Sequence, residues 1–168
     1  HRLDLSIGTL LLFLKRWLKM FKVIKISKDV IKKIYLIIKK NNYKENTSST
    51  LGTHNGYQSE NIIKLFNKNL LKKILPLDDF YKEIFHIHYI EYFLNGYQEE
   101  HHHKRTEKYS FILYLNNSDG DTVFKEPINK RITPELGKLI FFNSEVLHRG
   151  ERSSTNKKIL VGAVEKNV

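Results

Sequence analysis

Cysteine is absent from the chain, so neither a disulfide framework nor a thiolate site can form. That absence fits a cytoplasmic protein, which is the location we expect. A membrane-spanning run is also missing, because the apolar stretch 7–14 is too short to cross a bilayer. Arg16 and Lys19 follow this stretch, whereas a signal peptide carries its charges before the apolar run. We therefore expect residues 5–19 to form an amphipathic helix that packs on the domain, and we expect no membrane association.

The chain also lacks a dense block of arginine, although its net charge is +11. Such an excess of positive charge attracts polyanions, nucleic acid included. Here the cations are mostly lysines scattered among isoleucine and asparagine, and aromatic residues do not alternate with them in one patch. We therefore expect that nucleic acid is not the partner.

The composition predicts a folded domain. The chain is 168 residues long and 40% hydrophobic, which is enough for one domain with a real core, and no internal repeat is visible. We expect residues 1–168 to form a single domain whose first part, 1–82, is a mostly helical support. Its predicted elements are a strand at 21–26, a helix that begins after Ser27, a long polar loop at 41–58 and a helix at 59–74.

From residue 83 onward the pattern changes to short strands separated by turns. Ile84, His86, His88, Ile90 and Tyr92 alternate with other apolar residues, so both faces of the first strand are predicted to be covered. Many short strands with frequent turns are typical of a sandwich or a barrel. The further predicted strands are 108–116, 121–125, 129–132, 138–143 and 157–164, with a turn at 149–156.

Two histidine sites stand out in this second half: the run His101-His102-His103, and His148. Side chains of an extended segment alternate with period two, so His101 and His103 face the same side and can bind one ion. Neutral imidazoles are common ligands of iron, zinc and copper. Taken alone, the run fits a solvated polar turn better than a metal site, because residues 99–105 are all charged or histidine.

Other short motifs accompany the histidines in a fixed order. They are Tyr92, Gly96-Tyr97, the histidine run, Tyr114-Leu115-Asn116, Asp119-Gly120-Asp121-Thr122-Val123-Phe124, Pro134-x-x-Gly137-Lys138-Leu139-Ile140-Phe141-Phe142, His148-Arg149-Gly150 and Lys158. This ordered set resembles the 2-oxoglutarate- and iron(II)-dependent dioxygenases, in particular their prolyl-hydroxylase-like branch. Each motif alone is weak, but their order over residues 83–165 is fairly specific.

The resemblance implies a mainly β fold with N-terminal helices (α+β). Residues 83–168 would form a double-stranded β-helix, that is, a cupin-like jelly roll. It also implies Fe(II) and 2-oxoglutarate as cofactors and the hydroxylation of a peptidyl or small-molecule substrate. His101, His103 and His148 would bind the metal, Lys158 would hold the distal carboxylate of 2-oxoglutarate, and Tyr92 and Tyr114 would hydrogen-bond this co-substrate.

One departure from the family concerns the first metal motif, His-x-Asp or His-x-Glu. The position of its acid is taken by His103, which leaves three alternatives: a three-histidine site, a two-histidine site with an open position, or a site without metal. Replacing a carboxylate with imidazole adds one positive charge to the iron centre. A non-catalytic or cupin-like metal-binding jelly roll is therefore the alternative function. An oxidative nucleic-acid demethylase is a further one, but the second arginine typical of that branch is absent.

The register of the last strand decides which lysine faces the co-substrate. Lys158 shares a face with Leu160, Gly162 and Val164, and an inward lysine must be paired with an anion. The opposite register would place Lys157 inside and Lys158 in solvent. For Tyr92 and Tyr114, an ordinary position in the aromatic core is the alternative.

Substrate contacts are predicted mainly in the long polar loop, which contains His54 and Tyr57 together with flexible glycines. The loop would serve as a lid or a recognition segment, or else as a plain connector. Arg149 would bind an anionic group of the substrate. His86 and His88 share the strand face of Tyr92 and could line the pocket, although we expect them to be ordinary histidines of the core or the sheet surface. The sequence leaves a monomer and a homodimer open.

Overall fold

The computed structural model describes residues 21–40, 53–77, 79–103 and 107–165. The helix expected at 5–19 and the first part of the expected loop, 41–52, lie outside these ranges. The described elements are β1 (Lys22–Lys25), α2 (Lys28–Lys40), β2 (Thr53–Gln58), η1 (Ile63–Leu65), α3 (Lys68–Ile74), η2 (Phe80–Lys82), β3 (Ile84–His101), β4 (Glu107–Tyr114), β5 (Thr122–Phe124), β6 (Lys130–Ile132), β7 (Lys138–Asn143), β8 (His148–Gly150) and β9 (Lys157–Glu165).

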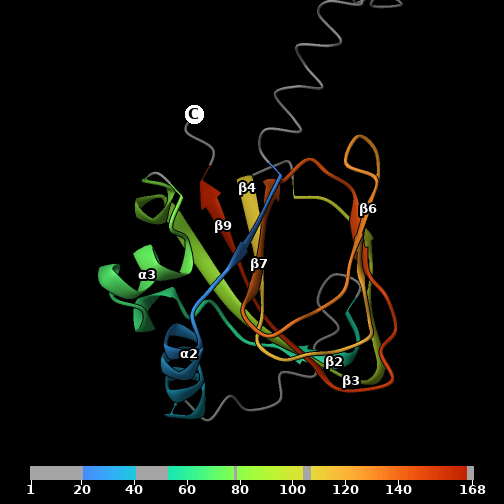
Figure 1. Cartoon of the computed structure of the whole chain (residues 1–168), viewed down its shortest axis with the longest axis horizontal. Coiled ribbons are helices and arrows are strands. Elements are labelled where there is room, and N and C mark those ends of the chain that lie inside the picture. Colours follow the sequence, from blue (N-terminus) through green and yellow to red (C-terminus); the bar gives the residue numbers. More distant parts are fainter. Residues whose placement is uncertain (1–20, 41–52, 78, 104–106, 166–168) are drawn as a thin grey trace, which may run out of the picture.

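The strands form one antiparallel sheet with the order β1-β7-β4-β9-β3-β8-β5-β6, and β2 pairs with β3 beside this path. The long strand β3 belongs to both halves of the sheet. Its residues 84–92 pair with β9, whereas Gln98 and His101 pair with β8. Figure 1 shows that the sheet curls at β3, so that β6 stands opposite β7. This is the architecture of a double-stranded β-helix, and the expected fold is confirmed.

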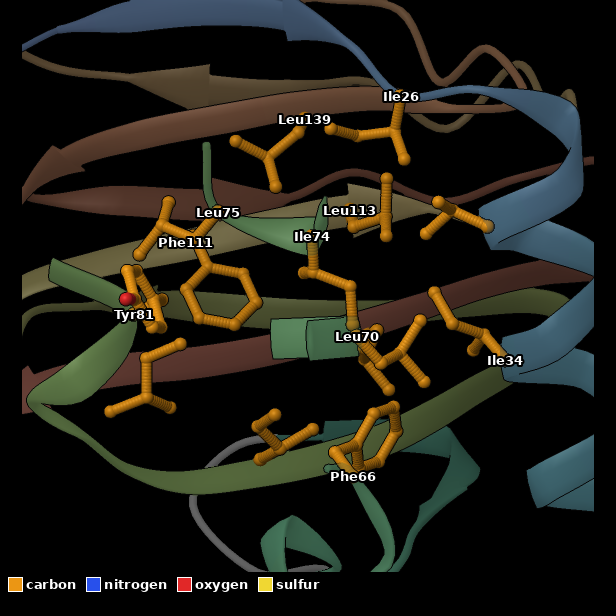
Figure 2. Packing of buried hydrophobic residues seen from close by; sticks show 14 of the residues in the cluster. Ile26, Ile34, Phe66, Leu70, Ile74, Leu75, Tyr81, Phe111, Leu113 and Leu139 are labelled. Atoms are coloured by element: carbon orange, nitrogen blue, oxygen red, sulfur yellow. The ribbon is translucent and has the colours of Figure 1, made fainter. Parts of the chain in front are cut away.

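Helices α2 and α3 cover the outer face of the sheet (Figure 1). Helix α2 begins after Ser27, whose carbonyl oxygen accepts hydrogen bonds from the N–H groups of Val30 at 3.1 Å and Ile31 at 3.2 Å. The side chain of Asn67 accepts the N–H of Leu70 at 2.9 Å and so caps α3. Figure 2 shows the apolar layer between these helices and the strands, with the labelled residues Ile26, Ile34, Phe66, Leu70, Ile74, Leu75, Tyr81, Phe111, Leu113 and Leu139.

The inner face of the curled sheet carries a second apolar cluster. Strand β4 shows the alternation, because Phe111 and Leu113 pack toward the helices while Ile112 and Tyr114 point into the interior. The two-sided apolar pattern of the sequence is thus explained by helices on one side and the barrel interior on the other. The inner cluster contains Ile90, Tyr92, Ile112, Tyr114, Phe124, Ile128, Ile140, Phe142, Val146 and Ile159.

Several local predictions were wrong. The segment 53–58 is not loop but strand β2, which pairs with β3 through a register shift between His54 and Gly56. Only glycine fits at position 56, because an added Cβ would lie 2.5 Å from the carbonyl oxygen of Glu91. The helix expected at 59–74 begins later, since the N–H of Ile62 donates to the carbonyl oxygen of Ile87 and holds this part beside β3.

Two more differences affect the strands around the site. The register between β3 and β9 shifts between Ile84 and His86. Ile84 therefore packs in the helix-side cluster, while His86 and His88 point the other way. The turn expected at 149–156 begins only after Gly150, because Arg149 and Gly150 belong to strand β8.

The division at residue 82 is also less sharp than expected, because β1 and β2 are strands of the main sheet. Among the described residues, no helix is both long enough and apolar enough to cross a membrane.

Candidate metal centre

Three histidines meet where β3 and β8 pair. His101 ends β3 and lies directly opposite His148, the first residue of β8. The ring centroids of these two residues are 4.3 Å apart, and those of His101 and His103 are 4.7 Å apart. One ring nitrogen from each of His101, His103 and His148 lies within 4.8 Å of the others. The structure therefore brings together the three residues expected as metal ligands.

The polar contacts of the three rings involve Nδ1 and leave Nε2 of each histidine for a metal. Nδ1 of His148 lies 2.9 Å from the carbonyl oxygen of Val146, and Nδ1 of His101 lies 2.7 Å from that of Glu99. A carbonyl oxygen only accepts, so both Nδ1 atoms carry the proton and both Nε2 atoms keep their lone pair. Nδ1 of His103 faces the Glu107 carboxylate at 3.6 Å, which orients this ring in the same sense.

Burial keeps these imidazoles neutral. It lowers the pKa of His148 to about 3, and the neighbouring imidazoles act in the same direction. Phe124 and Phe142 pack against the ring of His148 with centroid distances of 5.7 Å and 4.9 Å. Burial also lowers the pKa values of His101 and His103. A metal can therefore bind to all three without displacing protons at neutral pH.

The histidines open into a cavity of about 320 Å³. Its wall comes from the inner face of the sheet and includes Ile90, Ile112, Phe142 and Ile159 beside the three histidines. This volume lies at the lower end of the roughly 300–1,000 Å³ that is usual for small-molecule sites. The surface of the cavity is thus mostly apolar by area, although many of the side chains that line it are polar.

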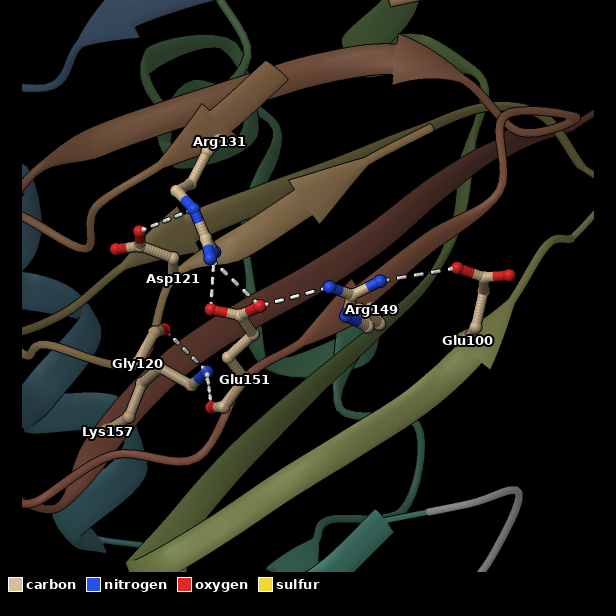
Figure 3. A network of polar contacts seen from close by, with 7 residues as sticks. All are labelled: Glu100, Gly120, Asp121, Arg131, Arg149, Glu151 and Lys157. Atoms are coloured by element: carbon tan, nitrogen blue, oxygen red, sulfur yellow. Dashed lines mark hydrogen bonds and ion pairs between the residues drawn. The ribbon is translucent and has the colours of Figure 1, made fainter. Parts of the chain in front are cut away.

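The cation in this wall is Lys157, so the register predicted for the last strand was wrong. Lys157 is 2% exposed, and its ammonium donates to the carbonyl oxygen of Gly120 at 2.9 Å and reaches that of Glu151 at 3.5 Å, as Figure 3 shows. Lys158 points to the opposite face of the sheet, where its ammonium lies 3.6 Å from the Glu91 carboxylate. Two adjacent lysines offer no sequence signal that tells which one faces in.

Burial of Lys157 lowers its pKa to about 8 against the opposing attraction of Asp121, Glu151 and Asp119. The carboxylate of Glu151 is itself engaged by Arg131 and Arg149, and Asp121 by Arg131 (Figure 3). Backbone carbonyls therefore hold the ammonium, and no carboxylate of the described residues binds it directly, which leaves it able to attract an anion in the cavity.

The two tyrosines expected near the co-substrate differ in position. Tyr92 lines the cavity, and the Lys157 ammonium lies 4.8 Å from the centre of its ring. Tyr114 is fully buried behind the wall and donates its hydroxyl to Thr122 at 2.6 Å. Thr122 lines the cavity where Tyr114 was expected, and the sequence did not mark Thr122 as a site residue.

The three residues expected to contact substrate lie outside this cavity wall. The ring of His54 stacks on Tyr97, and its Nε2 lies 2.7 Å from the Glu99 carboxylate. The hydroxyl of Tyr57 donates to Glu91 on the helix side of β3. Arg149 stands between the inward residues of β8, so alternation turns it outward to Glu151 and Glu100 (Figure 3).

Three polar residues of the wall were missed or misjudged from the sequence. His86 and His88 line the cavity and were expected to be ordinary sheet histidines. Glu107, the first residue of β4, was not singled out at all, although it lies between His86 and His103. Glu107 is only four residues from His103, but it is 21 residues from His86, and only the folded sheet brings those two together.

Comparison with known proteins places the fold. No protein-family model and no curated protein sequence matches the chain. Among solved structures, it is similar to a 2OG-Fe(II) oxygenase family protein from Burkholderia pseudomallei, with a TM-score of 0.67, 10% identity and coverage of 98% of this chain and 93% of that one. It is also similar to the viral collagen prolyl hydroxylase of Paramecium bursaria Chlorella virus-1 in its 2OG complex, with a TM-score of 0.60, 18% identity and coverage of 88% and 97%.

A third similar structure is a Trichoplax adhaerens prolyl hydroxylase in complex with a peptide fragment of hypoxia inducible factor, with a TM-score of 0.62, 12% identity and coverage of 96% and 94%. The chain thus has the double-stranded β-helix fold of the 2-oxoglutarate- and iron(II)-dependent oxygenases. The resemblance that the motifs indicated is confirmed at the level of the fold.

Proposed function

We propose that this protein is an Fe(II)- and 2-oxoglutarate-dependent oxygenase that hydroxylates a peptidyl or small-molecule substrate. The observation that carries the proposal is the composition of one cavity: three neutral imidazoles and a buried ammonium line the interior of the same double-stranded β-helix. A metal with a chelating dicarboxylate requires these two kinds of group together.

The donor set fits iron. Imidazole nitrogen is a suitable ligand for Fe(II), and three protein ligands leave coordination positions for a co-substrate and oxygen. His101, His103 and His148 would hold the ion. When bound, iron would supply the oxidising chemistry that couples the conversion of 2-oxoglutarate to succinate and carbon dioxide with hydroxylation of a C–H bond.

Lys157 takes the role that the sequence analysis gave to Lys158. An ammonium has three donors, and the contacts with Gly120 and Glu151 use at most two of them. The remaining donor and the positive charge would bind the distal carboxylate of 2-oxoglutarate. Tyr92 shapes the wall beside it, and the apolar residues around both groups exclude water, which strengthens the ion pair.

A peptidyl substrate is supported by the similar prolyl hydroxylase that was solved with a peptide. A small molecule remains the alternative, because His86 and His88 give the cavity its own polar groups. The proposal includes a cytoplasmic location, and both a monomer and a homodimer are compatible with it.

The test is turnover without added substrate, measured as oxygen uptake and succinate formation from 2-oxoglutarate and Fe(II). We expect slow uncoupled turnover that disappears in His148→Ala. The cupin-like alternative is favoured by the imidazole in place of the acidic ligand, and it predicts metal binding with no consumption of 2-oxoglutarate. That result, obtained with a folded and metal-loaded protein, would contradict the proposal.

A further inference from the structure

A carboxylate lies directly behind the metal-binding histidines. Glu107 is the first residue of β4 and is only 8% exposed, although it carries a carboxylate. Burying a carboxylate is unfavourable unless it is paired. Its partners therefore indicate why it is there.

Both oxygens of Glu107 are engaged. Oε1 lies 2.9 Å from Nε2 of His86 and 3.6 Å from Nδ1 of His103. Oε2 accepts the hydroxyl of Ser110 at 2.8 Å, and this hydroxyl is also 2.7 Å from that of Ser144. These partners fix the carboxylate at the back of the His103 ring.

The same group of residues also fixes the backbone of His103. The N–H of His103 donates to the carbonyl oxygen of Ser144 at 2.8 Å, and the N–H of Glu107 lies 3.3 Å from the carbonyl oxygen of His103. The backbone of His103 is thus held by Glu107 and by Ser144, and Ser110 links Ser144 to the Glu107 carboxylate. By contrast, His101 and His148 are oriented by backbone carbonyls alone.

We propose that Glu107 is the positioning residue of the metal centre, an inference that rests on the proposed function. Its carboxylate accepts the Nδ1 proton of His103, directs Nε2 of this ring at the metal and supplies the negative charge that a histidine ligand lacks. Carboxylates that hold a ligating imidazole in this way raise its basicity.

The sum of charges supports this role. A histidine at position 103 makes the ligand set one unit more positive than two histidines and one acid would be. Glu107 supplies one negative charge beside His103. The net charge of the centre with Glu107 included therefore equals that of a site with two histidines and one acid. Oε1 of Glu107 and Nδ1 of His103 are 3.6 Å apart, longer than a hydrogen bond, and metal binding would have to bring them closer.

The test is anaerobic titration of Co(II), followed through its visible absorption spectrum, in the wild type and in Glu107→Gln. The amide keeps the shape and loses the charge. We expect the dissociation constant of Co(II) to rise by about 10- to 100-fold, the range observed when such orienting partners are removed. Glu91→Gln is the matched control, because Glu91 is a shielded carboxylate on the opposite face of the sheet, 3.6 Å from Lys158. It should bind Co(II) like the wild type.

A double-mutant cycle separates positioning from general stability. In the H103D background the ligand itself carries the negative charge, and Glu107 then repels it. The same Glu107→Gln change should therefore leave Co(II) affinity unchanged or improve it there. A loss of equal size in both backgrounds, or wild-type affinity in E107Q, would overturn the inference.

Two further outcomes of the titration also have a defined meaning. If E107Q does not fold by circular dichroism, Glu107→Asp takes its place, because it retracts the charge from His103, and wild-type affinity in this variant would overturn the inference. If the wild type itself binds neither Co(II) nor Fe(II), the proposed function fails and this inference falls with it. Tight binding by the wild type with an unaffected E107Q overturns the inference alone.

Discussion

The ammonium of Lys157 lies 4.8 Å from the ring centre of Tyr92, its direct partner across strands β9 and β3. The neighbouring pair, Lys158 and Glu91, points to the other face of the same sheet. The two lysines therefore form an internal control: they are adjacent in sequence and opposite in environment.

Replacing Lys157 with methionine should remove the anchor for the distal carboxylate. Loss of one partner of a buried charge pair costs about 3 kcal/mol, so the dissociation constant of 2-oxoglutarate should rise roughly 100-fold. Lys158→Met removes only a partly exposed ion pair and should change it by less than about 1 kcal/mol. Calorimetry with Mn(II) in place of iron measures both variants. A larger effect of the Lys158 variant would reverse the assignment.

The pH should affect co-substrate binding and stability in opposite directions. The pKa of Lys157 is lowered from 10.5 to about 8, so the binding-competent charged form declines above pH 8 and 2-oxoglutarate affinity should fall. Between pH 8 and 10.5 the unfolded chain binds more protons at this residue than the folded chain does. The free energy of unfolding should therefore rise over this window, by up to about 3 kcal/mol relative to Lys157→Met. Affinity that stays constant up to pH 9.5 would contradict the burial of a functional ammonium.

Gly150 should be required for the position of Lys157. A Cβ added there would lie 3.2 Å from Nζ of Lys157, so the ammonium has to move by a few tenths of an ångström. We expect Gly150→Ala to fold, to bind Fe(II) like the wild type and to bind 2-oxoglutarate several-fold more weakly. Separate titrations of metal and co-substrate measure this, and an unchanged 2-oxoglutarate affinity would argue that Lys157 does not contact it.

Replacing Gly162 tests how tightly the sheet packs at the wall of the cavity. An added Cβ would come within 2.3 Å of the Phe111 ring and 2.9 Å of the carbonyl oxygen of His86. Overpacking of this kind costs typically about 1–3 kcal/mol, so Gly162→Ala should lower the free energy of unfolding by this amount in urea. Phe111→Leu in the same chain should recover part of the loss, and strictly additive effects would show that the two side chains do not compete for space.

Sequence alone was sufficient for the features that depend on local pattern. Alternating residues predicted the strands and their two apolar faces, and Ser27 predicted the start of α2. The spacing of His101 and His103 predicted that both face one side, and the structure adds His148 to the same cluster. Local pattern carries this information because it depends only on the period of the backbone.

Other features depend on pairing between distant strands and could not be predicted. The bulge between Ile84 and His86 reverses which residues face the helices, and nothing in the alternation of this strand marks it. The choice between Lys157 and Lys158 is a shift of one residue, which exchanges the two faces of a strand. The contact of Glu107 with His86 exists only because β3 and β4 both pair with β9 in the folded sheet.

Anaerobic titration of Fe(II) with and without 2-oxoglutarate tests the central claim most directly, read as the visible metal-to-ligand charge-transfer band of the chelate. We expect a band that requires both components, that is lost in His148→Ala and Lys157→Ala, and that persists in Lys158→Ala. Iron binding with no charge-transfer band on addition of 2-oxoglutarate, or no iron binding at all, would contradict the account.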